Sequence, residues 1–577
     1  MSAVIEFKDF SFRYKTQNEF TLHDINLTIN KGEKVLILGP SGSGKTTLGS
    51  CINGLIPFSF NGDIKGSCKV CGKETKEESI FKISEHVGTV QQDTDAQFVG
   101  LSVGEDIAFS LENDMTPRNI MLEKVEQSAT IVGMEKFLMS VPYNISGGQK
   151  QKVALAGILH NDVEILLFDE PLAALDPAMG NSAVDLIDKI HREYKKTILI
   201  IEHRLEDVLY RHVDRIILMN EGRIILDTTP DKLLSSDILK QNGIREPLYI
   251  SALKNAGIKF NENDKLASIE DLNMDAYKDK IISHFKQAKL TPSAPKTKKL
   301  IEVKNVSYCY GDYKALNNIS FDLYEGERIA VVGKNGAGKS TLAKLLCGII
   351  RPSEGQIVLE GEDYLKYSIK ELGEIVGYVM QNPNQMLVKD IIKDEIELAL
   401  KLNDFDEETM KQRVEDTLRM TGLYPMRNWP VSVLSYGQKK RVTIASILAL
   451  QPKIIILDEP TAGQDYKHYT EIMNFITELN EKYNITILFV THDMHLAIEY
   501  TERAIVFSDG DMIGDDVVYK ILSNDEIISK ASLKKTSLVS IAQKCGIDPE
   551  KYIHHFIECE KEERDNGWKT IYNSNSW

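Results

Sequence analysis

Two glycine-rich stretches hold the residue types that bind a phosphate chain. Residues 39–46 read GPSGSGKT and residues 333–340 read GKNGAGKS, each directly after an apolar run typical of a buried strand. In this pattern small residues let backbone N–H groups wrap phosphates at a helix N-terminus, the lysine reaches the β- and γ-phosphates, and the next hydroxyl ligates Mg²⁺. Two strand-led copies indicate two sites for nucleoside triphosphate. The expected phosphate-binding residues are Gly39, Ser41, Gly42, Gly44, Lys45, Thr46 and Thr47, and Gly333, Asn335, Gly336, Gly338, Lys339, Ser340 and Thr341.

Paired carboxylates form the second chemical feature. EILLFDE (164–170) and KIIILDE (453–459) each place an aspartate and then a glutamate at the end of an apolar strand. Asp169 and Asp458 are expected to hold Mg²⁺ together with Thr46 and Ser340. Glu170 and Glu459, one residue on, are expected to orient an attacking water. Solvation of a strand edge is the alternative, but the matched spacing from both glycine-rich loops favours catalysis.

The elements that must position these residues repeat along the chain. Each half begins with alternating strands (5–14 and 301–310), followed by the phosphate-loop strand and helix. A polar, more helical region comes next, at about 105–140 and 390–425. Apolar strands and helices then alternate to the end of each half. This order predicts a mostly parallel sheet covered on both faces, duplicated in one chain.

Composition limits the class of protein. The 577 residues carry a net charge of −16, which argues against a general polyanion binder. No apolar run reaches the roughly 18 residues that a transmembrane helix needs, and the first residues lack a signal-peptide pattern. Cys68 and Cys71 form a lone C-x-x-C without a second pair at zinc spacing. We interpret them as ordinary strand cysteines in a reducing compartment, by default the cytoplasm.

The repeat sets the expected domain boundaries. We expect a first domain at 1–256, a linker at 257–299, a second domain at 300–523 and a helical tail at 524–577. Prolines and lysines at 291–299 indicate the linker. The tail segment 533–547 resembles 244–258, so the accessory ends are duplicated too. His554 and His555 in the tail are expected to be surface residues rather than ligands.

The motifs ISGGQ (145–149) and LSYGQ (434–438) carry a family resemblance. They resemble the LSGGQ signature of ABC ATPases, and each half is similar to the nucleotide-binding domain of that family. The resemblance implies two tandem α/β P-loop domains, each with a parallel or mixed sheet core, an antiparallel β subdomain and a helical subdomain that carries the signature. In the family this motif grips the γ-phosphate bound to the opposite domain. The signature residues expected to contact ATP are Ser146, Gly147, Gly148, Gln149, Ser435, Tyr436, Gly437 and Gln438.

Further family positions match in both halves. Gln92 and Gln381 resemble the Q-loop glutamine, which contacts Mg²⁺ and faces the transport partner. His203 and His492 resemble the switch histidine that contacts the γ-phosphate. Segments 173–176 and 462–465 resemble D-loops. Tyr14 and Tyr310 resemble the residue that stacks on adenine, although buried strand tyrosine is the alternative.

Finer features resemble one subfamily. EHRLEDV (202–208), QNPNQ (381–385) and the repeated tail segments resemble the duplicated ATPases of energy-coupling factor (ECF-type) importers. That resemblance implies ATP and Mg²⁺ as cofactors and separate membrane partners, namely a transmembrane scaffold and a substrate-binding subunit. It also implies a peripheral position at the cytoplasmic face, no nucleic acid, and uptake of a vitamin, cofactor precursor or metal ion. Segments 93–98 and 382–387 are expected to receive a scaffold helix.

Two alternatives and one asymmetry remain open. A soluble tandem ABC ATPase acting on ribosomes or nucleic acid would carry a longer inserted helical linker or coiled coil. A scaffold that binds ATP without hydrolysis is opposed by both glutamates and both histidines. Tyr436 replaces a signature glycine, which adds bulk and restricts the backbone; the alternative is that its side chain points away and leaves the N–H donors in place. The resemblance places 435–438 against Lys45 and 146–149 against Lys339, so we expect the Lys339 site to carry more turnover.

Overall fold

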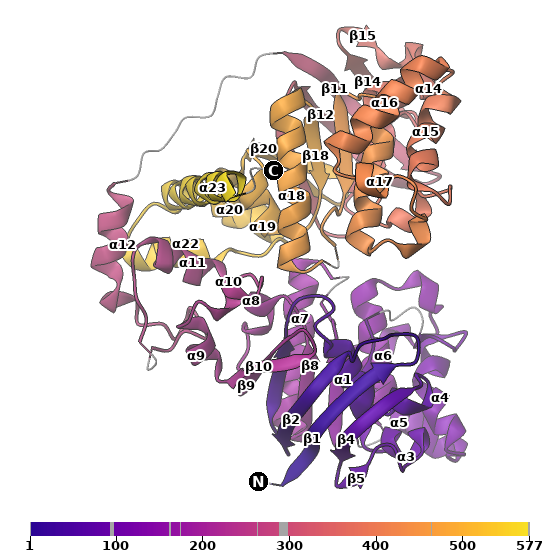
Figure 1. Cartoon of the computed structure of the whole chain (residues 1–577), viewed down its shortest axis with the longest axis vertical. Helices are drawn as coiled ribbons and strands as arrows, with labels where there is room; N and C mark the ends of the chain where they lie inside the picture. Colours follow the sequence, from indigo (N-terminus) through magenta and orange to yellow (C-terminus); the bar gives the residue numbers. More distant parts are fainter. Residues whose placement is uncertain are drawn as a thin grey trace. The chain divides into compact units, whose positions relative to one another are not determined.

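The chain divides into two compact units, Met1–Tyr277 and Lys278–Trp577 (Figure 1). The computed structural model describes residues 2–92, 97–160, 163–172, 175–261, 264–287, 298–462 and 464–574. Each unit contains one six-stranded and one four-stranded sheet. Among the described residues, none of the helices combines the length and apolarity that crossing a membrane requires.

In the first unit the two sheets have different strand directions. The four-stranded sheet, ordered β2-β1-β4-β5, is antiparallel. The six-stranded sheet, ordered β10-β9-β3-β8-β7-β6, is parallel except for β10 at its edge. The strands are β1 (Ala3–Tyr14), β2 (Leu22–Asn30), β3 (Lys34–Leu38), β4 (Gly62–Val70), β5 (Lys73–Glu74), β6 (Val87–Val90), β7 (Ile165–Asp169), β8 (Thr197–Ile201), β9 (Arg215–Asn220) and β10 (Arg223–Thr228).

Helices of the first unit flank these sheets. Residues of α4, α5 and α6 pack on one another and form the helical region. The helices are α1 (Lys45–Ile52), α2 (Leu55–Phe58), α3 (Ile80–Ser84), α4 (Val103–Asn113), α5 (Arg118–Val132), α6 (Gly147–Leu159), α7 (Pro177–Tyr194), α8 (Leu205–Val208), α9 (Pro230–Leu234), α10 (Ile238–Gln241) and α11 (Leu248–Asn255). The parallel strands β3 and β8 are buried along their whole length, because helices and the second sheet cover both faces.

The second unit repeats this plan. Its sheets are ordered β12-β11-β14-β15 and β16-β17-β18-β13-β19-β20. The strands are β11 (Lys299–Tyr310), β12 (Tyr313–Tyr324), β13 (Arg328–Gly333), β14 (Glu354–Leu359), β15 (Glu362–Asp363), β16 (Val376–Val379), β17 (Ile454–Asp458), β18 (Thr486–Val490), β19 (Arg503–Ser508) and β20 (Asp511–Val517). The predicted fold class is confirmed, with a mixed core sheet, an antiparallel sheet and a helical region in each unit.

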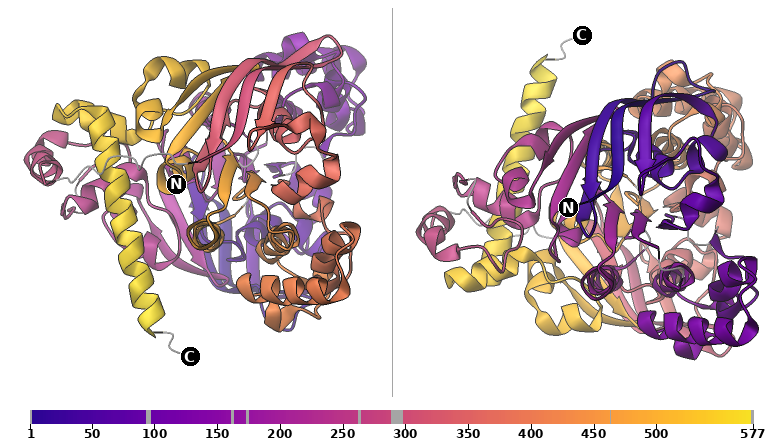
Figure 2. Two further views of the ribbon diagram at one scale, coloured as in Figure 1. Left: turned by 90° about the horizontal axis from the view of Figure 1, so that it is seen from above. Right: turned by 90° about the horizontal axis from the view of Figure 1, so that it is seen from below.

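The helices of the second unit also follow the first. They are α12 (Lys278–Phe285), α13 (Lys339–Leu346), α14 (Ile369–Ile375), α15 (Ile392–Leu402), α16 (Glu407–Met420), α17 (Tyr436–Leu448), α18 (Tyr466–Tyr483), α19 (Met494–Tyr500), α20 (Val518–Ser523), α21 (Asp525–Lys530), α22 (Ser537–Cys545) and α23 (Pro549–Ser574). A hydrophobic cluster of buried residues joins α15, α16 and α17 into the helical region that carries the second signature. Figure 2 shows α23 as one long yellow helix close to the C-terminus.

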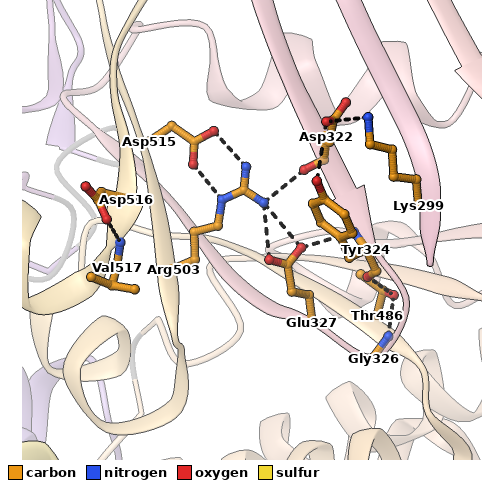
Figure 3. Close-up of polar contacts among 10 residues, drawn as sticks. All are labelled: Lys299, Asp322, Tyr324, Gly326, Glu327, Thr486, Arg503, Asp515, Asp516 and Val517. Atoms are coloured by element: carbon orange, nitrogen blue, oxygen red, sulfur yellow. Dashed lines mark hydrogen bonds and ion pairs between the residues drawn. The ribbon is translucent and has the colours of Figure 1, made fainter. Parts of the chain in front are cut away.

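A buried arginine ties the two sheets of the second unit together (Figure 3). Arg503 on β19 donates two hydrogen bonds to the Asp515 carboxylate on β20, at 2.5 and 2.7 Å. Its other guanidinium nitrogen donates to Glu327, at 3.2 Å, and to the backbone carbonyl of Asp322 on β12, at 2.9 Å. Bidentate charge-assisted bonds of this kind fix geometry as well as adding energy. The antiparallel sheet is therefore held to the edge of the core sheet.

The first unit contains the same arrangement around Arg215. Arg215 donates to Asp227 at 2.6 Å, to Glu33 at 3.2 Å and to the carbonyl of Thr28 at 2.9 Å. Its side chain is 25% exposed, whereas that of Arg503 is 8% exposed. The contact was duplicated with the domain, but it is more deeply buried in the second copy.

The stretch predicted as a linker contains structure. Within 257–299 the chain forms a 3₁₀ turn at Met274–Ala276 and then α12, whose Ile281 is buried. The residues 288–297, which include most of the proline- and lysine-rich end, lie outside the described residues. The expectation that His555 is a surface residue is wrong, because its side chain is only 7% exposed. The α12 residues His284 and Phe285 pack against the His555 ring.

Candidate active sites

The first phosphate loop connects β3 to α1. Gly44 caps α1 with a left-handed backbone (φ 96°). The Lys45 ammonium donates to the carbonyls of Gly39, at 2.8 Å, and Pro40, at 2.9 Å, so the charge lies inside the loop. A Cβ at Gly39 would lie 2.3 Å from the carbonyl oxygen of Met219. Glycine is therefore required there, and the loop keeps its N–H groups and ammonium directed to one point.

The second loop has the same geometry. Lys339 donates to the carbonyls of Gly333, at 2.7 Å, and Lys334, at 2.9 Å. Gly333 has φ 148°, and a Cβ there would lie 2.2 Å from the carbonyl of Phe507. The remaining loop residues lie as follows: Ser41, Gly42, Thr46, Asn335, Gly336 and Ser340 are exposed, Thr341 is half-buried, and Thr47 is buried.

The two tyrosines predicted to stack on adenine have different surroundings. The Tyr14 hydroxyl lies 3.1 Å from the Thr47 hydroxyl, and its ring packs edge-on against Phe12 at 4.7 Å. Tyr310 packs edge-on against Tyr308 at 4.9 Å and is 44% exposed. Tyr310 thus offers more open ring surface than half-buried Tyr14.

The first aspartate–glutamate pair lies beside the phosphate loop. The Thr46 hydroxyl donates to Asp169 at 3.4 Å, so the hydroxyl and carboxylate predicted to share Mg²⁺ meet. Burial, with the neighbouring charge of Glu170, raises the pKa of Asp169 to about 6. Desolvation of this kind disfavours an anion without a cation partner. Hydroxyl and carboxylate oxygens are the donors that Mg²⁺ prefers, so these residues fit that ion.

In the second unit the corresponding aspartate has a different donor. Tyr378 on β16 donates its hydroxyl to Asp458 at 2.7 Å. Burial raises the pKa of Asp458, while the bond from Tyr378 opposes that rise. The first unit has Thr89 at the matching place in its sequence, VGTVQQ against VGYVMQ. The two predicted metal sites therefore differ in the side chain next to the carboxylate.

Both predicted catalytic glutamates have an unusual backbone. Glu170 and Glu459 follow the ends of β7 and β17 with φ of 48° and 43°. Their amides donate to the carbonyls of Ile201 and Val490, each at 2.9 Å. A left-handed non-glycine residue costs about 1–3 kcal/mol and persists where the surroundings enforce it, often at functional sites. The strand ends thus turn each glutamate toward the following strand and its histidine.

The histidines pair with these glutamates at different distances. His492 Nδ1 lies 2.6 Å from Glu459 Oε1, whereas His203 Nδ1 lies 3.8 Å from Glu170 Oε1. His203 also lies 3.4 Å from a carboxylate oxygen of Glu202, which is fully buried. Burial opposes the charged imidazole, but the nearby carboxylates of Glu170 and Glu202 outweigh burial and raise the pKa of His203.

The predicted Q-loop glutamines also have different partners. Gln92 donates its side-chain amide to Glu170 at 2.5 Å. In the second unit the backbone carbonyl of Gln381 accepts bonds from the Tyr436 hydroxyl, at 3.0 Å, and from Lys440, at 2.8 Å. The Q-loop of the second unit is therefore attached to its signature helix α17.

The signature motifs begin α6 and α17. Ser146 and Ser435 are the N-caps, and each forms a capping box with the glutamine three residues on. The backbone N–H of Ser435 donates to the side-chain oxygen of Gln438 at 3.0 Å, and the backbone N–H of Gln438 donates to the Ser435 hydroxyl at 3.3 Å. Gly147, Gly148 and Gly437 lie in the first helical turn, whose N–H groups form an anion-binding end. Tyr436 is 41% exposed at the first position of α17.

The predicted D-loops are described only in part. Ala173, Ala174 and Gly463 lie outside the described residues. Asp176 and Asp465, the last residues of the two motifs, are the N-caps of α7 and α18. Both motifs therefore end by starting a long helix.

Known proteins share these features. A family model described as "ABC transporter" matches residues 22–173 and 316–462. The chain belongs to the ABC transporter family. A second model, "ATP-binding cassette cobalt transporter", matches residues 236–308. This ABC protein therefore contains two ATP-binding domains and is an ATPase.

Relatives extend over nearly the whole ABC protein. An ABC transporter ATP-binding protein of Clostridium perfringens is 54% identical over 98% of this chain and 99% of its own length. One from Enterococcus faecalis is 51% identical, over 97% and 99%. The solved structure of cbiO1 from Clostridium perfringens, described as part of the ABC transporter complex cbiONQ, is 34% identical, with a TM-score of 0.38, over 41% of this chain and 94% of that one.

Sequence reasoning did not assign several residues near the sites of this ABC protein. Tyr378, Lys440 and Glu202 each contact a predicted site residue or its carbonyl. Lys440 is fully buried, and this burial lowers its pKa to about 8. A comparison of the two halves could have found these residues, because a different residue type stands at each matching position of the other half.

Proposed function

We propose that this ABC ATPase supplies energy to a membrane importer of the energy-coupling factor type. Its cargo would be a vitamin, a cofactor precursor or a metal ion. The observation that supports this most is the match of 236–308 to the model "ATP-binding cassette cobalt transporter", because that stretch joins the two ABC halves. The proposal includes a separate transmembrane scaffold and a separate substrate-binding subunit, which hold the ATPase at the cytoplasmic face.

The proposed catalysis uses the same parts in both units. When bound, Mg²⁺ would neutralise phosphate charge between Thr46, Gln92 and Asp169, and between Ser340, Gln381 and Asp458. Lys45 and Lys339 attract the β- and γ-phosphates. Glu170 and Glu459 orient the attacking water, and His203 and His492 contact the γ-phosphate beside those carboxylates. Positioning and electrostatics carry phosphoryl transfer, so each group contributes mainly through its placement.

The proposed scaffold contact lies just after each Q-loop. In the first unit 93–96 lie outside the described residues and Phe98 is half-buried, while Val99 (62%) and Leu101 (82%), just beyond the predicted 93–98, are exposed. In the second unit Asn382 caps a 3₁₀ turn at Pro383–Gln385 and Met386 is half-buried, while Val388, one residue beyond the predicted 382–387, is 71% exposed. Apolar side chains beside a nucleotide-sensing loop suit a helix that transmits the state of the site to a membrane chain.

Disulfide or short-linker crosslinking tests this function. Leu101→Cys and Val388→Cys are placed separately in the full chain and expressed with its neighbouring membrane genes. The matched control is Phe81→Cys on α3, which is 80% exposed, and the unmodified chain reports background from Cys309, the exposed native cysteine among those described. Crosslinks to a membrane chain from Leu101→Cys and Val388→Cys, but not from Phe81→Cys, support the importer. Crosslinks to ribosomal proteins instead would overturn it.

A further inference from the structure

Three potential metal ligands converge in the second unit, away from the phosphate loops. His284 lies on α12, and His555 and Cys559 lie on α23. The ring nitrogens His284 Nδ1 and His555 Nε2 are 3.1 Å apart. Cys559 Sγ lies 3.8 Å from His555. One ligand atom from each residue falls within 4.8 Å of the other two.

These distances suit a tetrahedral ion. With Zn–N of about 2.0–2.1 Å and Zn–S of about 2.3 Å, tetrahedral ligand atoms are about 3.3–3.6 Å apart. From His555 Nε2 the separations are 3.1 Å to His284 and 3.8 Å to Cys559, close to that range, and the third pair lies within 4.8 Å. His555 and Cys559 are four residues apart, so they share one face of α23. Small side-chain adjustments would complete the geometry.

The histidine pair lies in a largely buried position beside an aromatic ring. His555 is 7% exposed, and the ring of Phe285 packs edge-on against it at 5.8 Å. Burial, with the neighbouring His284 and His554, lowers the pKa of His555 to about 4. Burial also lowers the pKa of His284.

A hydrogen-bonded histidine pair is the simpler account of the 3.1 Å contact. One neutral ring donating to the other satisfies two nitrogens. That account also makes Cys559 a weak S–H donor to His555 at 3.8 Å, so the two accounts differ in whether the three side chains take up a metal ion. Two imidazoles with one thiolate form the donor set of a borderline-soft ion, not of Mg²⁺ or Ca²⁺.

We propose that His284, His555 and Cys559 bind one zinc ion, with water as the fourth ligand. Binding would transfer the Cys559 thiol proton to solvent and form one Zn–S and two Zn–N bonds. The ion would fasten α12, in the stretch that precedes β11, to the C-terminal helix of the same unit. The inference does not depend on the proposed transport function.

Metal titration of the untagged full-length protein tests the site. The chain is stripped with a chelator without nucleotide, so that the phosphate loops do not contribute, and titrated with Zn²⁺ and separately with Co²⁺. We expect one tight equivalent, tetrahedral cobalt absorption and a thiolate-to-cobalt band. Cys559→Ser should abolish that band, and Cys559→Ser and His284→Gln should each weaken zinc binding at least about tenfold.

The matched controls change a histidine and a cysteine that lie outside the proposed zinc site. His554→Gln alters the adjacent histidine, which stacks on Tyr519 at 4.5 Å, and Cys309→Ser removes an exposed cysteine on β11. Both should bind zinc like the wild type. The site is refuted if the stripped protein takes up no stoichiometric zinc, or if Cys559→Ser and His284→Gln bind as the controls do.

A second measurement needs no variant and therefore no assumption about folding. Zinc should slow alkylation of Cys559 by iodoacetamide at least about tenfold, read by mass spectrometry, and leave Cys309 unaffected, because a metal-bound thiolate is a poor nucleophile for added reagent. Equal alkylation rates with and without zinc would overturn the proposal.

Discussion

The two ATP-binding halves have glycine-rich loops of the same geometry, but the residues around their predicted Q-loop glutamines make different contacts. In both, a lysine lies inside the loop and a glutamate with left-handed backbone follows the aspartate. In the first half Gln92 contacts Glu170 directly. In the second, Gln381 is bonded through its carbonyl to α17, and Glu459 is bonded to His492.

The difference shows which parts of a duplicated site tolerate change. The phosphate loops are constrained by backbone contacts closer than any side chain allows, as at Gly39 and Gly333. The side chains near the predicted Q-loop glutamines and strand-end acids differ between the halves: Thr89 matches Tyr378, Gly147 matches Tyr436 and Glu202 matches Thr491. Such divergence is expected when two sites divide their work.

The largest effect should come from removing both predicted catalytic carboxylates. Glu170→Gln with Glu459→Gln keeps side-chain shape but removes the charge that orients water. We expect ATP hydrolysis in the complete transporter to fall at least about hundredfold, with ATP binding retained. Phosphate release measures the loss, and filter binding of labelled ATP is the control. Activity within twofold of wild type would contradict the assigned roles.

The single variants test the asymmetry. Glu459→Gln should lose more activity than Glu170→Gln, because His492 holds Glu459 at 2.6 Å while His203 lies 3.8 Å from Glu170. Measurement in the complete transporter is needed, since coupled sites slow one another. Equal losses would leave the two halves equivalent, and a larger loss from Glu170→Gln would reverse the order.

Stability should differ at the duplicated arginine. Arg503→Met leaves Glu327, 8% exposed, without its partner, which for a buried pair costs about 3–5 kcal/mol. Arg215→Met should cost less, because Arg215 is 25% exposed and water reaches its acidic partners. Thermal unfolding of the full chain gives both shifts. If Arg215→Met lowered the unfolding temperature more than Arg503→Met, burial of the arginine would not explain the difference in stability between the two variants.

A smaller effect is expected from Tyr436→Phe. The change removes the 3.0 Å bond to the Gln381 carbonyl but keeps the ring. A bond of about 1 kcal/mol corresponds to about a fivefold change in turnover stimulated by the membrane subunits. The lower turnover should appear when Tyr436→Phe is combined with Glu170→Gln, because Glu459 of the second unit then remains the active carboxylate. An equal effect in a Glu459→Gln background would rule out a role confined to the second unit.

The smallest expected effect is a change in the pH dependence of ATP hydrolysis by the first half, caused by a lower pKa of His203. Glu170 and Glu202 raise the pKa of His203, and Arg204 opposes them. The charged imidazole therefore adds stability below its unfolded pKa, and this is lost as pH rises through the folded pKa. Glu202→Thr, the residue type at position 491, should lower that pKa. The measurement is the pH dependence of ATP hydrolysis in a chain that also carries Glu459→Gln, so that only the first half is active. With Glu202→Thr this pH dependence should move toward acid by less than about one unit. The control Glu193→Gln changes an exposed glutamate and should not move it.

The sequence predicted the parts of this ATPase better than their mutual contacts. The loops, strand-end acids and signature caps follow from local spacing, because backbone geometry enforces it. The bonds from Tyr378 to Asp458 and from Tyr436 to Gln381 join residues 80 and 55 apart, so no local pattern reports them. The burial of His555 was missed although Tyr552, Ile553, Phe556 and Ile557 line the buried face of α23.

The central place of β3 has a consequence for synthesis on the ribosome. β3 is complete at Leu38, but its register partners begin at Ile198 on β8 and Arg215 on β9. At about 5–20 residues per second, this apolar strand waits about ten to forty seconds for its neighbours. β13 faces the same delay before Ile487 and Arg503 emerge. Each phosphate loop is therefore translated early and completed late, so the nascent chain must be protected from aggregation until its unit is nearly finished.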